Sequence, residues 1–127
     1  MGYKPTRGAT LLMPFNEVPH LFVIMNDPCK DGLCLTLIVS SIKKGRKYDP
    51  SCVLDAGDHE FIKQPSFVVY RLAETPRATH LVNMVTKNFY KPKVEISGVI
   101  FGRIVGGLWA SDEVRGRIAR YATAAGL

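Results

Sequence analysis

Three histidines are the residues of this chain best suited to moving protons near neutral pH. Imidazole changes its charge in that range, so acid-base chemistry would most simply recruit His20, His59 or His80. A hydrogen-bonded structural role at a strand end or in a turn is the alternative for each. Asp58 and Glu60 flank His59, but adjacent side chains on a strand point to opposite faces, which argues against a metal site there.

A run of basic residues beside one tyrosine indicates an anionic partner. Residues 43–50 read KKGRKYDP, and the whole chain carries a formal net charge of +6, which favours phosphates or acidic proteins. Cations next to a stacking ring are the combination with which proteins hold single-stranded nucleic acid. A solvated turn is the alternative. The candidate nucleic-acid-binding residues are Lys43, Lys44, Arg46, Lys47 and Tyr48.

The cysteines and the missing motifs narrow the chemistry further. Cys29, Cys34 and Cys52 are odd in number, and their spacing fits neither CxxC nor a zinc ribbon, so we expect small buried or turn residues in a reducing compartment. The chain has no glycine-rich phosphate loop, nucleophile elbow or HExxH motif, which excludes the common nucleotide-hydrolysing, hydrolase and zinc-protease classes. We expect no metal and no cofactor.

Length and composition are those of one globular domain. The 127 residues are 46% hydrophobic and 22% charged, which predicts a single domain over residues 1–127 with its own core. The longest apolar run, residues 33–42, is too short to cross a bilayer, and no signal-peptide core develops near the N-terminus. We therefore expect a cytoplasmic protein with no membrane contact.

Short apolar stretches predict strands over the first part of the chain. Residues 20–25 and 33–42 flank a turn at 29–32, which favours a hairpin. Residues 66–73 are dense in β-branched and aromatic side chains and predict a further strand, with a shorter one at 51–54.

The second part of the chain predicts helices. Apolar side chains recur at helical spacing in residues 77–87 and 97–109. A last helix is expected to start at Ser111 as its N-cap and to stop at Gly126. Strands over 1–75 followed by helices over 76–127 predict an α+β fold, a small curled sheet covered on one side.

The order of the strands resembles the PemK/MazF-type toxin family. HLFVIMND at 20–27 is similar to the family's early strand, and LIVSSI at 37–42 to the strand that ends in a Thr/Ser pair. SFVVYRLAET at 66–75 is similar to the later strand that carries polar catalytic side chains. The resemblance implies a small, strongly bent antiparallel β-barrel of the SH3-like kind, followed by C-terminal helices.

The resemblance also implies an activity: an endoribonuclease that cuts single-stranded RNA without a metal. In such a mechanism a base takes the ribose 2′-hydroxyl proton, the oxygen attacks the phosphate, and a cation offsets the developing charge. The family's Arg-x-Asp arrangement falls on Tyr70 and Leu72, so the arginine of this chain stands one position away, on the other face of a strand. The candidate catalytic residues are Arg71, His20, Ser40 and Ser41.

Two classes of function follow from these observations. The first is the toxin-type ribonuclease, whose partners would be single-stranded RNA or an acidic antitoxin-like protein, with a possible homodimer. The second is a non-enzymatic module that uses the same fold to bind nucleic acid or an acidic protein. Convergence of a cation, an imidazole and a hydroxyl in one cleft distinguishes the first from the second.

Overall fold

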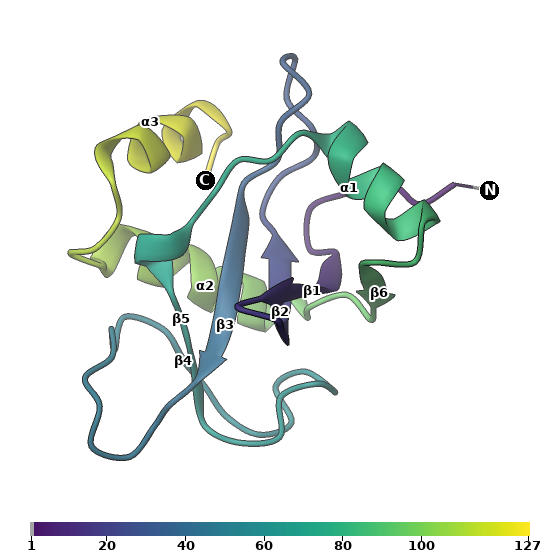
Figure 1. Ribbon diagram of the computed structural model, residues 1–127. Coiled ribbons are helices and arrows are strands. Elements are labelled where there is room, and N and C mark those ends of the chain that lie inside the picture. Colours follow the sequence, from purple (N-terminus) through teal and green to yellow (C-terminus); the bar gives the residue numbers. More distant parts are fainter. Residues whose placement is uncertain (1) are drawn as a thin grey trace.

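A six-stranded antiparallel sheet forms the centre of the molecule, in the order β4-β5-β3-β2-β1-β6 (Figure 1). A computed structural model describes residues 2–127. The strands are β1 (Thr10–Phe15), β2 (Val18–Ile24), β3 (Thr36–Ser41), β4 (Val53–Leu54), β5 (Ser66–Val68) and β6 (Lys91–Lys93). The helices are the short 3-10 helix η1 (Tyr70–Leu72), α1 (Ala78–Thr86), α2 (Gly98–Ala110) and α3 (Gly116–Ala124). The α+β class is confirmed, and in residues 2–127 no helix combines the length and the apolar character that a membrane span requires.

Two reversals of the chain bring the first three strands together. Asn16 and Glu17 have φ of 51° and 66° and form the two-residue turn between β1 and β2, a conformation that suits the twist of a hairpin. Between β2 and β3 the chain turns at residues 29–32. The hairpin predicted from residues 20–25 and 33–42 is therefore confirmed as the β2–β3 pair.

Helices cover both faces of the sheet. Leu21 and Val39 lie on the face that packs against α2 and α3, whereas Leu11 lies on the opposite face with Leu81 of α1. Figure 1 shows α2 passing behind the strands. Burying a leucine or valine side chain stabilises the fold by about 1.5–3 kcal/mol, so both layers contribute. Cover is therefore not confined to one side as expected, because α1 packs on part of the second face through Leu81.

The second part of the chain contains a strand that the sequence did not predict. β6 pairs antiparallel with β1, Pro92 lying opposite Leu11, so residues 76–127 are not wholly helical. Asn88, with φ of 65°, turns the chain back after α1. Proline cannot donate to a sheet ladder and is confined to edge strands, which is the position of β6.

The strand predicted over residues 66–73 ends early. Only Ser66–Val68 pairs with its neighbours, and the chain then winds into η1. The cause is Tyr70, which is fully buried and donates its hydroxyl hydrogen to the Ile104 carbonyl over 2.7 Å. Anchoring this ring under α2 turns the backbone out of the sheet.

The last helix starts later than expected. Ser111 stands at the C-terminal end of α2 rather than at the start of α3, which begins at Gly116. Its hydroxyl donates to the Asp49 carboxylate over 2.5 Å and accepts the Glu113 backbone N–H at 3.0 Å. The serine therefore secures the junction between the two helices instead of capping α3.

The two edges of the sheet are joined by a side chain and not by a ladder. β4 and β6 are the edge strands and are not paired with each other, so the sheet is not closed and the barrel is not confirmed. His59, which follows β4, donates from Nε2 to the carbonyl of Val94, which follows β6, over 2.7 Å. The Thr10 hydroxyl donates to the same carbonyl over 2.6 Å.

Candidate functional site

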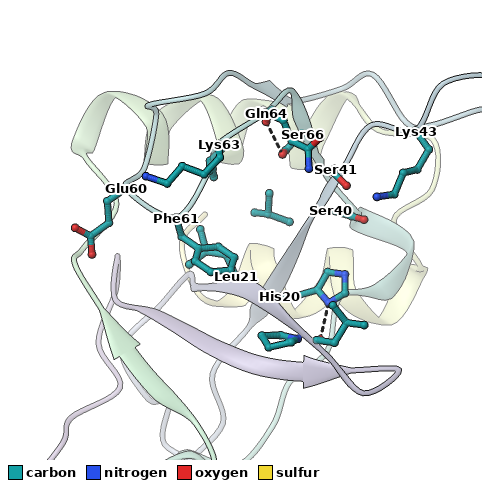
Figure 2. A pocket seen from close by; sticks show the side chains of 14 residues that line it. His20, Leu21, Ser40, Ser41, Lys43, Glu60, Phe61, Lys63, Gln64 and Ser66 are labelled. Carbon is teal, nitrogen blue, oxygen red and sulfur yellow. Dashed lines mark hydrogen bonds between the residues drawn. The ribbon is translucent and has the colours of Figure 1, made fainter.

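A cleft of about 480 Å³ opens at one end of the sheet, where β2 and β3 separate. The two strands are paired as far as Leu21 and Val39, and the next residues, His20 and Ser40, stand where the ladder ends. Residues 60–64, between β4 and β5, form the third wall. Figure 2 shows side chains from all three segments arranged around one hollow.

The hydrogen bond of His20 fixes which nitrogen carries its proton. Nδ1 lies 2.9 Å from the Val18 carbonyl, and a carbonyl only accepts, so Nδ1 is the donor. In the neutral ring the lone pair is then on Nε2, which faces the cleft in Figure 2. The Phe15 ring packs edge-on against the imidazole, with centroids 5.8 Å apart, and holds it in place. His20 is thus oriented as a proton acceptor.

Two serines and a lysine line the same hollow. Ser40 and Ser41 end β3, where they lie opposite Phe67 and Ser66 of β5, and both are half-buried in the cleft wall. Lys43 follows two residues after Ser41, and its side chain extends back towards Ser40 in Figure 2. Hydroxyl donors beside a flexible cation are a combination that binds phosphate.

The third wall was missed by the sequence analysis. It contains Phe61, with Glu60 and Lys63 at the rim opposite Lys43. His59 positions it: this histidine is 4% exposed, and its Nδ1 accepts the backbone N–H of Phe61 at 3.0 Å. No motif marks this segment, because its place in the cleft depends on the contact between His59 and the strand edge.

Comparisons with known proteins show which known fold the chain resembles. No protein-family model matches the chain, and no curated protein matches its sequence. Among solved structures, it is similar to a chain in the crystal structure of MazE-MazF (Form-II) from Deinococcus radiodurans, with a TM-score of 0.55 and 14% identity. The superposition covers 85% of this chain and 94% of that chain. The protein has a MazF-like fold. At this identity the likeness is one of fold alone.

Within the MazF-like fold, the predicted catalytic residues do not all meet. His20, Ser40 and Ser41 line the cleft together. Arg71 does not: it lies in η1, exposed, because the strand that was expected to carry it ends at Val68. The cations that line the cleft are instead Lys43 and Lys63.

The other predicted nucleic-acid-binding residues do not line the cleft of the MazF-like domain. Lys44, Arg46 and Lys47 are exposed on the loop between β3 and β4. Tyr48 packs its ring on Phe67 of β5, with centroids 5.5 Å apart and planes inclined by 48°. Residues 43–48 are all exposed, and the first of them, Lys43, reaches the cleft.

The cysteines lie away from the cleft. Cys34 and Cys52 are buried, and burial raises the pKa of the Cys34 thiol to about 11. Cys29 is half-buried in the β2–β3 turn, where a hydrogen bond from Tyr121 lowers the pKa of its thiol. Within residues 2–127, no three His, Cys, Asp or Glu side chains are grouped to hold a metal ion.

Proposed function

We propose that this protein is a toxin-type endoribonuclease that cuts single-stranded RNA without a metal ion. One observation carries the proposal: an imidazole oriented as a proton acceptor, two serines and a lysine line one cleft. These residues are His20, Ser40, Ser41 and Lys43. The MazF-like fold supports the toxin class.

The proposed reaction assigns a task to His20, Lys43 and Ser40. His20 Nε2 takes the proton of a ribose 2′-hydroxyl, and the freed oxygen attacks the adjacent phosphorus. The bond from phosphorus to O2′ forms as the bond to O5′ breaks, and the departing O5′ takes a proton from water in the open cleft. The Lys43 ammonium and the Ser40 hydroxyl offset the charge on the phosphoryl oxygens. The products are a 2′,3′-cyclic phosphate and a 5′-hydroxyl.

The basic loop guides the substrate and a protein partner in this proposal. Lys44, Arg46 and Lys47 are exposed on the same loop as Lys43, and their positive charge attracts a phosphate chain. The solved relative is a MazE-MazF complex, and we extend a protein partner of that kind to this chain: an acidic antitoxin-like protein that occupies the cationic cleft. We include assembly as a homodimer in the same proposal.

Cleavage rates of four variants test the assignment. In EDTA, His20→Ala should cut single-stranded RNA about 10²- to 10⁴-fold more slowly than the wild type, because a positioned base contributes about that factor. Lys43→Ala and Ser40→Ala should also slow cleavage. Arg71→Ala is the matched control and should cleave at the wild-type rate, since Arg71 lies outside the cleft.

The alternative function is a binding module that holds RNA or an acidic protein without cutting it. It is favoured by one observation: among the cleft-lining residues within 2–127, His20 is the only imidazole, so no second one is available to protonate the leaving group. RNA that is bound but intact after long incubation with the wild type would select this alternative. A rate for Arg71→Ala as low as that for His20→Ala would contradict the residue assignment.

A further inference from the structure

A pair of aromatic rings lies one strand away from the cleft. Tyr48, on the loop between β3 and β4, packs on Phe67 of β5, with ring centroids 5.5 Å apart. Tyr48 remains 41% exposed, and Phe67 is half-buried. Neither ring belongs to the buried hydrophobic core. The exposed part of the Tyr48 ring is therefore available to a ligand.

Sheet register connects the rings to the cleft. Phe67 lies directly opposite Ser40 in the antiparallel β3–β5 ladder, so the two side chains are on the same face of the sheet. Directly opposed Cβ atoms are about 5 Å apart. Ser40 lines the cleft and Phe67 does not. The ring pair of Tyr48 and Phe67 is therefore the surface adjacent to the cleft on the side of Ser40.

Hydrogen bonds of the neighbouring residue, Asp49, fix the position of Tyr48. The next residue, Asp49, is buried and accepts hydrogen bonds from the Ser51 backbone N–H at 3.0 Å and from the Ser111 hydroxyl at 2.5 Å. These bonds tie the end of the basic loop to the end of α2. The ring is therefore attached to a fixed point, although the loop before it is exposed.

We propose that Tyr48 and Phe67 form a base-stacking subsite for the nucleotide that follows or precedes the phosphate held at Ser40. A phosphate in the cleft is flanked by two nucleotides, and one of them reaches the ring pair. Lys47 stands beside Tyr48 in the sequence and supplies charge for the next phosphate. Stacking on aromatic rings tolerates any base, so the subsite adds affinity without sequence preference. This inference rests on the proposed function.

Binding to two matched oligomers tests the subsite. One is a random-sequence 2′-O-methyl RNA, which cannot be cleaved by 2′-hydroxyl attack; the other is an abasic oligomer of equal length that keeps every phosphate. The wild type should bind the RNA roughly 5- to 150-fold more tightly than the abasic oligomer. Tyr48→Leu should lose that preference while keeping its affinity for the abasic oligomer, and Tyr48→Phe, which keeps the ring, should bind as the wild type does.

Phe67→Leu provides a second variant and should lose part of the same preference. Equal weakening of Tyr48→Leu towards both oligomers, or no weakening, would overturn the subsite. So would equal binding of both oligomers by the wild type. If the wild type neither binds nor cleaves RNA, the proposed function falls as well. If it cleaves RNA while Tyr48→Leu binds both oligomers like the wild type, only the subsite falls.

Discussion

Asp49 is a buried carboxylate whose charge is satisfied by hydroxyl and amide hydrogens. It is 6% exposed and accepts bonds from the hydroxyls of Ser51 and Ser111, at 2.6 Å and 2.5 Å. Burial acts to raise its pKa, but the hydrogen bonds from Ser111 and Ser51 together outweigh burial and hold the pKa below its ordinary value of 3.8. The ionised form is therefore the one that the folded protein prefers.

This preference predicts a pH-dependent contribution to stability. Because the pKa is lower in the folded than in the unfolded state, the unfolded state binds more protons as the pH falls below 3.8, and stability is lost there. At pH 7 we expect Asp49→Asn to lower the free energy of unfolding by about 1–3 kcal/mol. Urea unfolding of both proteins from pH 3 to pH 7 should show the difference shrinking below pH 4. A difference that stays constant with pH would contradict this account.

The sequence indicates residue types at the site better than residue roles. Ser40 and Ser41 could be predicted from the end of one apolar stretch, residues 33–42, and His20 from the start of another, residues 20–25. His59 has an equally polar context, yet it is buried and joins the two sheet edges through Val94. No local pattern separates the two histidines, because the partner of His59 lies 35 residues away in the sequence.

At the level of the elements, α2 packs closely at Gly107 against η1 and the residues before β4. A Cβ at this position would overlap the Tyr70 hydroxyl and would lie 2.8 Å from the Cys52 Cβ and 2.9 Å from the Ser51 carbonyl oxygen. Glycine lowers helix stability, but here it permits the contact. The neighbouring Gly106 is exposed, and a Cβ there would meet nothing within 4 Å.

The two glycines form a matched pair of substitutions. Gly107→Ala should destabilise the protein by about 1–3 kcal/mol, because the added methyl overpacks the contact with Tyr70. Gly106→Ala should stabilise it by about 0.5–1 kcal/mol, because alanine favours the helix and meets no obstacle. Thermal unfolding of both variants measures the two effects. Equal shifts in the same direction would contradict the predicted close approach.

Elements with strong periodicity could be predicted, and those defined by tertiary contact could not. Residues 77–87 and 97–109 predicted α1 and α2 closely, since apolar spacing shows the buried face. The edge strand β6, with the sequence Lys-Pro-Lys, has no apolar pattern of its own and pairs only because β1 is available. The early end of β5 depends on the buried Tyr70 hydroxyl, a contact with α2.

At the level of the whole molecule, the cleft forms because two central strands stop pairing at one end of the sheet. β2 and β3 part beyond Leu21 and Val39, and the two loops after β3 and β4 extend from that end of the sheet (Figure 1). The resemblance of three short stretches was enough to predict the MazF-like fold. It was not enough to predict the cation of the cleft, because Lys43 reaches it through the course of a loop.

The chemical ends of the RNA products test the central claim most directly. Wild-type protein is incubated with single-stranded RNA in EDTA, and the fragments are weighed by mass spectrometry. The account predicts 2′,3′-cyclic phosphate and 5′-hydroxyl ends, and no cut where a single 2′-deoxy nucleotide replaces the one that supplies the attacking oxygen. Intact RNA, or fragments that carry 5′-phosphates, would contradict it.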